Sequence, residues 1–368
     1  MNYIVNRDRT ISKAVFACTN SGQLTGEEGL HWLSSDRLSA VGGEPLDCPV
    51  TCFNTNYGTV EELTERMKTM TPQGKRRVHL LALGDVGATV LLGLRLLGSD
   101  CIESIGICDI NENVLKRYEC EMNQMAWPME YDAMPEVKIV SKEHLFDCDV
   151  FVFCASKSVP PVGTEGVDVR MVQLEGNRQI VGSFASQAAQ AGYGGMFCVV
   201  SDPVDPLCRA AWLAGEGKLL PEQIQGFGLG VMNARAAYYA KKDERFTSFL
   251  TEGRAFGPHG ADLVIANSIE NYDEELSLEL TKKTVEANLE VRGLGFKPYL
   301  APAISSAAIS LILMMRGEWH YSSNFLGGVW MGSRNRTTEA GLEIEQLPLP
   351  EPLYQRIKRA YENLKVIG

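Results

Sequence analysis

The middle of the chain alternates short apolar runs with helix-length segments, and this alternation restricts the possible folds more than any other feature of the sequence. The apolar runs have the length and composition of buried strands and lie at 78–83, 104–108, 137–140, 150–154 and 196–200. A helix-length segment separates each run from the next. Strands that alternate with helices in this way form a parallel sheet with helices on its faces. The sequence therefore predicts an α/β fold with a doubly wound parallel sheet of the Rossmann type.

A glycine-containing turn follows the first of these runs, and an acidic residue ends the second. The turn reads Ala82-Leu83-Gly84-Asp85-Val86-Gly87, and Asp109 follows 22 residues after Gly87. Gly84 would let the backbone approach a pyrophosphate, and Gly87 would let strand and helix pack closely. A carboxylate at Asp109 can accept hydrogen bonds from a ribose diol and would repel a 2′-phosphate. Gly84, Asp85, Val86, Gly87 and Asp109 are therefore predicted to bind NAD, although Ala82 replaces the first glycine of the usual motif.

The pattern of apolar residues and expected helices differs on either side of this region. Residues 1–76 show one clear helix, at 60–70, and no chemical motif. After residue 206 the pattern shifts to longer helices, expected at 234–240, 276–292, 303–315 and 353–364. Three parts are therefore expected: an N-terminal extension of unknown role (1–76), a dinucleotide-binding domain (77–205) and an α+β substrate domain (206–368).

Charge and composition exclude several other classes of protein. A net charge of -11 and a pI of about 5.1 disfavour general binding to nucleic acid, because phosphates would be repelled. No apolar stretch has the length of a bilayer span, and no apolar segment follows the basic residues at the start, so a cytoplasmic protein without membrane contact is expected. The ten cysteines are not spaced as a disulfide framework or as metal ligands, which indicates reduced thiols and no metal site.

Taken in order, several further motifs resemble those of the lactate/malate dehydrogenase family. After the glycine turn and Asp109 they are 150–156, Asn177, 200–205, Asn233-Ala234-Arg235 and Gly257-Pro258-His259-Gly260, so the resemblance covers about four fifths of the chain. It implies an NAD-dependent enzyme that transfers a hydride between nicotinamide and a small 2-hydroxy or 2-oxo acid. It also implies a homodimer or homotetramer. Residues 1–76 lie outside the resemblance.

The resemblance assigns a role to each matching position. His259 matches the histidine that transfers the hydroxyl proton, a task that suits imidazole because its pKa lies near neutrality. Arg235 matches the arginine whose guanidinium fork holds the substrate carboxylate. Arg170 stands seven residues before Asn177, where the family has a loop arginine that polarises the substrate carbonyl. Asn177 is implied to bind substrate, and Ala155 and Ser201 to bind the cofactor.

The sequence also departs from the family pattern. Met232 stands where the family has an aspartate that orients the histidine, and a thioether cannot replace that carboxylate. Asp202 stands where the family has asparagine, and three interpretations remain open: it orients His259, it binds a cationic amine or imine, or it caps backbone amides. Asp262 is a weaker candidate partner for the histidine. The loop between 155 and 170 is lengthened, and Lys157 and Ser158 are candidate readers of the substrate side chain.

Three functions are compatible with these motifs. The first is an NAD-dependent dehydrogenase or reductase of a 2-hydroxy or 2-oxo acid, or of a related imino acid. The second is a non-catalytic NAD-binding protein that has lost turnover through Met232. The third is an NAD- and metal-dependent glycosidase on the same fold, which Ser-Asp-Pro-Val-Asp at 201–205 disfavours because it supplies neither cysteine nor histidine.

Overall fold

The computed structural model describes residues 2–7, 9–157 and 169–367, with the backbone alone for 169–173. Its strands are β1 (Tyr3–Asn6), β2 (Val15–Asn20), β3 (Pro45–Asn54), β4 (Arg76–Leu81), β5 (Ile102–Cys108), β6 (Glu136–Ile139), β7 (Val150–Phe153), β8 (Met196–Val199), β9 (Ile224–Gly226), β10 (Arg254–Phe256), β11 (Val264–Ala266), β12 (His320–Leu326), β13 (Val329–Thr338) and β14 (Gly341–Ile344). Its helices are α1 (Ser35–Ala40), α2 (Val60–Met70), α3 (Asp85–Leu97), α4 (Glu112–Asn123), α5 (Val169–Gln190), α6 (Val204–Ala214), α7 (Leu229–Ala240), α8 (Phe249–Glu252), α9 (Glu274–Gly293), α10 (Ile309–Met315) and α11 (Glu351–Ile367). A π-helix, Pro302–Ala308, leads into α10.

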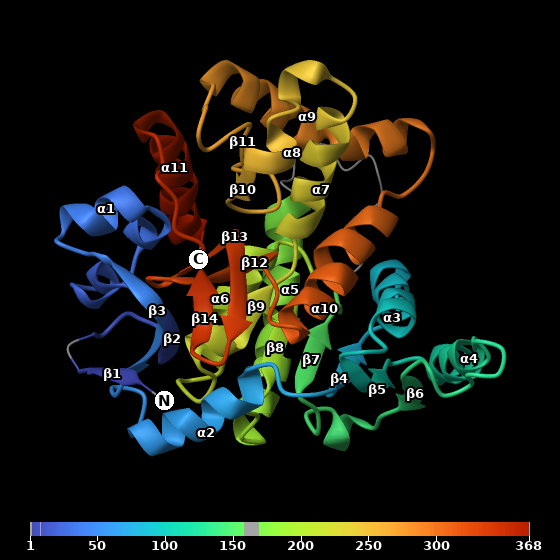
Figure 1. The fold of residues 1–368 in the computed structure, drawn as a ribbon. Coiled ribbons are helices and arrows are strands. Elements are labelled where there is room, and N and C mark those ends of the chain that lie inside the picture. Colours follow the sequence, from blue (N-terminus) through green and yellow to red (C-terminus); the bar gives the residue numbers. More distant parts are fainter. Residues whose placement is uncertain (1, 8, 158–168, 368) are drawn as a thin grey trace.

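One sheet of 12 strands runs through the whole described chain, in the order β1-β3-β2-β14-β13-β12-β9-β8-β7-β4-β5-β6 (Figure 1). The six strands from β9 to β6 are mutually parallel. Numbered along the chain, these six pair in the order 3-2-1-4-5-6, which is the doubly wound order that binds dinucleotides. The α/β, Rossmann-type fold predicted from the sequence is confirmed.

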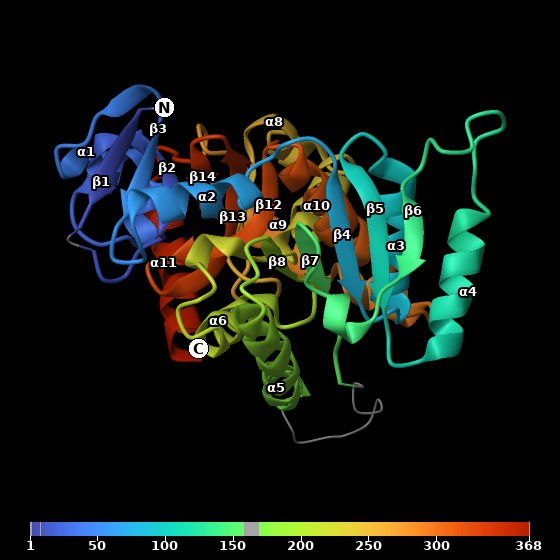
Figure 2. The ribbon, with the colours of Figure 1, turned by 90° about the horizontal axis from the view of Figure 1, so that it is seen from below.

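Helices cover both faces of the parallel half, and each strand contributes alternate side chains to the two cores. On β7, Val150 and Val152 pack with α3 and α10, whereas Phe151 and Phe153 pack with α5 and α6. All four side chains are buried, so the run carries apolar residues at successive positions rather than at every second one. Figure 2 shows α5 and α6 together on one side of the sheet.

The strands after residue 300 extend the sheet in antiparallel fashion. β12 pairs with β9 through Ser323 and Gly226, and β13 and β14 follow as a meander. A separate two-stranded hairpin, β10 and β11, lies beside α7, α8 and α9 above this region in Figure 1. The core there joins side chains of α7, α8, α9 and the hairpin.

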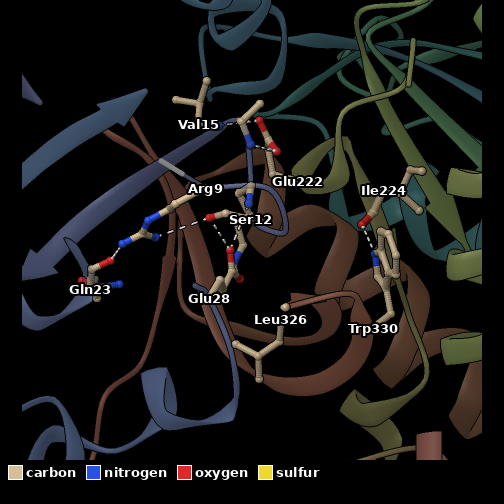
Figure 3. A network of polar contacts seen from close by, with 12 residues as sticks. Arg9, Ser12, Val15, Gln23, Glu28, Glu222, Ile224, Leu326 and Trp330 are labelled. Carbon is tan, nitrogen blue, oxygen red and sulfur yellow. Dashed lines mark hydrogen bonds and ion pairs between the residues drawn. The ribbon is translucent and has the colours of Figure 1, made fainter. Parts of the chain in front are cut away.

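The first 76 residues add three more strands to the same sheet. β2 pairs in parallel with β14 through Phe16 and Leu342, and β3 and β1 continue the sheet to its edge. A carboxylate from the parallel half holds the start of β2: Glu222 accepts hydrogen bonds from the backbone N–H groups of Ala14 (3.0 Å) and Val15 (2.8 Å). Figure 3 shows this contact beside the buried polar network of the N-terminal segment.

That polar network is enclosed almost entirely by protein. Lys13 and Glu28 form an ion pair whose side chains are 1% and 0% exposed. Glu28 also accepts hydrogen bonds from the Lys13 backbone N–H (3.0 Å) and from the Ser12 hydroxyl (3.1 Å). Arg9 donates a hydrogen bond to the carbonyl of Gln23 (Figure 3). Its guanidinium also lies over the ring of Trp32. Each buried charge therefore has partners, as buried charges require.

Burial raises the pKa of Glu222 to about 7, against the opposing effect of its hydrogen bonds with Ala14 and Val15. The folded state thus binds a proton at Glu222 more readily than the unfolded chain, so the contribution of this group to stability is greatest at low pH and falls as the pH rises from about 4.5 to about 7. We expect this group to contribute a loss of about 3 kcal/mol across that window. In Glu222→Gln the group no longer titrates, and urea unfolding at pH 5 and pH 8 should differ less than in the wild type.

The control for this comparison is Glu286→Gln, which removes an exposed carboxylate of α9 and should leave the pH dependence of the wild type unchanged. An equal pH dependence in the wild type and in Glu222→Gln would show that Glu222 does not titrate on unfolding.

All ten cysteines are free thiols, and seven of them are buried. No helix among the described residues has both the length and the apolar character to cross a membrane.

Candidate active site

The predicted site residues gather at the carboxyl ends of the parallel strands. The glycine turn follows β4, Asp109 follows β5, Ala155 follows β7 and Ser201 follows β8. The chain order reverses between β4 and β7, and in sheets of this kind ligands bind at such a switch point. His259 reaches the same edge from the turn that joins β10 and β11.

The glycine turn has a tightly constrained geometry. Ala82 adopts φ +73°, a left-handed conformation that favours glycine, so this position keeps the shape of the motif despite its methyl group. A Cβ added at Gly87 would lie 2.0 Å from the Ala82 carbonyl oxygen, which explains why α3 can pack this closely on β4. A Cβ added at Gly84 would meet nothing within 4 Å. The N-terminus of α3 therefore faces open space that can admit a phosphate.

Asp109 is fixed at this turn by two backbone hydrogen bonds. Its Oδ2 accepts from the Leu83 N–H (2.7 Å), and its Oδ1 accepts from the Asn111 N–H (2.9 Å). A carboxylate has about four acceptor positions, so capacity remains for a diol. Asp85, the first residue of α3, forms an ion pair with Lys297 (3.0 Å).

Hydrogen bonds join the segments that follow β7 and β8. The Ser201 hydroxyl donates to the Ala155 carbonyl (2.7 Å). The buried Asn177 side chain accepts from the Lys157 N–H (2.9 Å) and donates to the Asp202 carbonyl (2.8 Å). Asn177 is thus a link between α5 and both segments, and it holds the backbone of Asp202 in place.

His259 and Asp202 are in direct contact. The His259 Nδ1 lies 3.2 Å from the Asp202 Oδ1, with side chains 19% and 60% exposed. A Cβ added at Gly228, the N-cap of α7, would lie 3.0 Å from the His259 Cβ, so the absence of a side chain there lets the histidine approach. The His259 Nε2 is buried and has no hydrogen-bond partner among the described residues.

Arg235 lies on α7, three residues after Met232. Its guanidinium Nη1 is 3.7 Å from the Met232 Sδ. Burial lowers the pKa of Arg235, while the charges of Tyr239 and Asp202 act in the opposite direction. Met232 is buried in the apolar core of α7, α8 and α9, so its side chain fills space rather than binding the histidine.

A second carboxylate near His259 and Asp202, that of Asp205, was not predicted from the sequence. Asp205, in the first turn of α6, is buried and accepts a hydrogen bond from the Ser323 hydroxyl of β12 (2.7 Å). Burial raises its pKa to about 6, and the charges of His259 and Asp202 act on it in opposite directions. An acid at the start of a helix is common, so no sequence signal separates this residue from an ordinary helix terminus.

Three predicted residues are not placed at the site. Ser158 and the side chain of Arg170 lie outside the described residues, although the backbone of Arg170 belongs to the first turn of α5. The described contacts of His259 include Asp202 and do not include Asp262. The role assigned to Arg170 by resemblance therefore stays a prediction.

No family model matches the sequence, but curated relatives do. The chain is 28% identical over 188 residues to an L-lactate dehydrogenase of Treponema denticola, a match that covers 50% of this chain and spans about half of the relative (55%). It is 22% identical over 320 residues to an L-lactate dehydrogenase of Staphylococcus epidermidis, which covers 79% of this chain and 98% of the relative.

Solved structures share the fold over the same part of the chain. The minor L-lactate dehydrogenase of Enterococcus mundtii in a ligand-bound form superposes with a TM-score of 0.66 and 20% identity, covering 80% of this chain and 97% of that structure. The malate dehydrogenase of Archaeoglobus fulgidus in complex with NADH superposes with a TM-score of 0.66 and 17% identity, covering 79% and 98%.

Proposed function

We propose that the chain is a divergent member of the lactate/malate dehydrogenase family and an NAD-dependent oxidoreductase acting on a small 2-hydroxy or 2-oxo acid, or on a related imino acid; its similarity to L-lactate dehydrogenases supports this. The observation that carries the proposal is the contact between His259 and Asp202 at the same sheet edge as the glycine turn. Such a pair replaces the carboxylate that Met232 cannot supply. The site thus keeps a histidine–carboxylate pair that can accept or donate a proton.

The residues present fit an NAD molecule. The open space at Gly84, the N-terminus of α3 and the remaining acceptor capacity of Asp109 suit a pyrophosphate and a ribose diol. Ala155 and Ser201, joined by their hydrogen bond, would line the path toward the nicotinamide end. Bound NAD would accept the hydride, and its reduced form would donate it.

The protein would supply orientation and proton transfer. The guanidinium fork of Arg235 would hold the substrate carboxylate through two parallel hydrogen bonds. Asp202 would accept a hydrogen bond from the His259 Nδ1–H and so fix the imidazole tautomer. Asn177 would keep Asp202 in position through its backbone carbonyl. A homodimer or homotetramer and a cytoplasmic location remain expectations from the family.

Two glycine substitutions separate cofactor binding from folding. Gly84→Val would project into open space but is a poorer N-cap of α3 than glycine, so we expect a loss of less than about 1 kcal/mol in the free energy of unfolding. The NADH dissociation constant should rise at least about tenfold, or about 1.4 kcal/mol. Gly87→Ala would collide with the Ala82 carbonyl, so we expect the folded state itself to be destabilised. NADH fluorescence and urea unfolding measure the two effects. Unchanged NADH affinity in Gly84→Val would show that the pyrophosphate does not bind at this turn.

A further inference from the structure

Two carboxylates flank the turn that would bind the pyrophosphate of NAD. Asp85 is the first residue of α3, directly after Gly84, and its side chain is 51% exposed. Asp109 accepts its hydrogen bonds from backbone N–H groups and forms no ion pair among the described residues. The helix N-terminus attracts an anion, whereas these carboxylates repel one. A pyrophosphate bound at this turn therefore needs a cation close to Asp85.

Lys297 supplies a cation at this place. Its Nζ lies 3.0 Å from the Asp85 Oδ2, although the two residues are 212 positions apart in the chain. The hydrogen bond to Asp85 raises the pKa of Lys297, so the ammonium group is charged at neutral pH. An ammonium group has three donors, so the contact with Asp85 leaves two for another acceptor. The side chain is 82% exposed, and a ligand can therefore reach these donors.

The connection between α9 and the π-helix brings Lys297 to the N-terminus of α3. Just after α9, Gly295 adopts φ +85° and turns the chain. The Tyr299 N–H donates to the Lys297 carbonyl (3.1 Å). The π-helix that follows packs closely on α3, because a Cβ added at Gly93 would lie 2.6 Å from the Ala308 Cβ. The backbone that carries Lys297 is thus anchored beside the helix whose first residue it contacts.

Deepening the proposed dehydrogenase function, on which this inference rests, we propose that Lys297 is a cofactor-binding residue whose ammonium group bridges Asp85 and the pyrophosphate of NAD. It neutralises the carboxylate that would otherwise repel the phosphates, and it donates a charge-assisted hydrogen bond to a phosphate oxygen. Lys297 thus acts on the affinity for the cofactor, whereas hydride and proton transfer depend on other residues.

Equilibrium binding of NADH to the full chain, followed by fluorescence, tests this role. We expect Lys297→Met to raise the NADH dissociation constant at least about tenfold. Lys297→Arg keeps the charge and should raise it by less than about threefold. Lys282→Met removes an exposed lysine of α9 and should bind NADH as the wild type does. The urea midpoint of Lys297→Met should stay unchanged, because both partners of the ion pair are exposed.

Two further measurements assign the effect to the phosphates and to Asp85. ADP carries a diphosphate and adenosine does not, so Lys297→Met should weaken displacement of NADH by ADP at least about tenfold and leave displacement by adenosine unchanged. In an Asp85→Asn background, Lys297→Met should cost less NADH affinity than in the wild type, because no carboxylate remains to be neutralised. Higher salt should weaken NADH binding more in the wild type than in Lys297→Met, because it screens the ammonium.

The outcomes separate this inference from the proposed function. Wild-type NADH affinity in Lys297→Met, or an equal loss of ADP and adenosine affinity, would overturn the role of Lys297 and leave the dehydrogenase function intact. An equal loss with and without the Asp85 carboxylate would overturn the bridge between the two residues. A wild-type protein that does not bind NADH would overturn the dehydrogenase function itself, and the role of Lys297 with it.

Discussion

Arg235→Leu is expected to lower kcat/KM for the best substrate by about 30- to 5000-fold, while the affinity for NADH stays unchanged. The range corresponds to the roughly 2–5 kcal/mol lost when one member of a buried, hydrogen-bonded charge pair is removed. The partly buried guanidinium has no carboxylate partner among the described residues, so its charge is available to a substrate. The loss should fall mainly on KM, because the carboxylate is bound equally in the ground and transition states.

Two further variants sharpen this prediction. Arg235→Lys keeps the charge but loses the fork, so it should recover only part of the activity. Arg292→Leu removes an exposed arginine in the last turn of α9 and should behave as the wild type. Steady-state kinetics and NADH fluorescence measure both quantities. If Arg235→Leu kept the wild-type kcat/KM, the carboxylate would have to bind elsewhere.

Lys13→Met is expected to lower the free energy of unfolding by about 3–5 kcal/mol, because it leaves the charge of Glu28 buried without its cation. Trp32 and Phe325 lie against the Lys13 ammonium and cannot compensate for that carboxylate. Lys13→Met combined with Glu28→Gln removes both charges, so it should recover part of the loss. Urea unfolding of the two single variants and the double variant gives the coupling between them.

The surface pair of Lys68 and Glu65 is the matched control, with side chains 53% and 72% exposed. Lys68→Met should change stability by less than about 1 kcal/mol, because solvent screens exposed pairs. A loss of similar size in Lys13→Met would mean that the buried pair contributes no more than a surface pair.

The parallel half of the fold could be predicted because its signals are local. Each buried strand is a continuous apolar run, and the run predicted at 150–154 corresponds to β7, Val150–Phe153. The helix predicted at 60–70 begins and ends as α2 does, and there Thr59 and Glu62 form a capping box. Both features lie within a few residues of each other in the chain, where sequence patterns carry the most information.

The strands at either end of the sequence could not be predicted, because distant partners determine them. β2 is held by Leu342 of β14 and by Glu222, which lie more than 200 residues away. β3 begins with Pro45 and is largely exposed over its first half, so it lacks the apolar run of a buried strand. The sequence therefore indicated an extension at 1–76 without showing that its strands join the main sheet.

Only part of the candidate site could be predicted, because its remaining contacts join residues that are far apart in the sequence. Resemblance to the family indicated His259 and Arg235 directly, whereas the role of Asp202 was left open among three interpretations. The structure brings its carboxylate to the His259 ring, a contact between residues 57 positions apart. The pairing of Asp205 with Ser323 spans 118 positions and has no local signature. Tertiary contacts of this kind become visible only once the sheet edge is assembled.

NADH fluorescence and absorbance on the purified protein show directly whether the protein oxidises NADH at this site. The protein is titrated with NADH and then mixed with 2-oxo acids, with and without methylamine. We expect saturable NADH binding, followed by oxidation that depends on the added acid and is lost in Arg235→Leu. Tight NADH binding with no oxidation by any of these compounds would contradict it and would favour a non-catalytic NAD-binding protein.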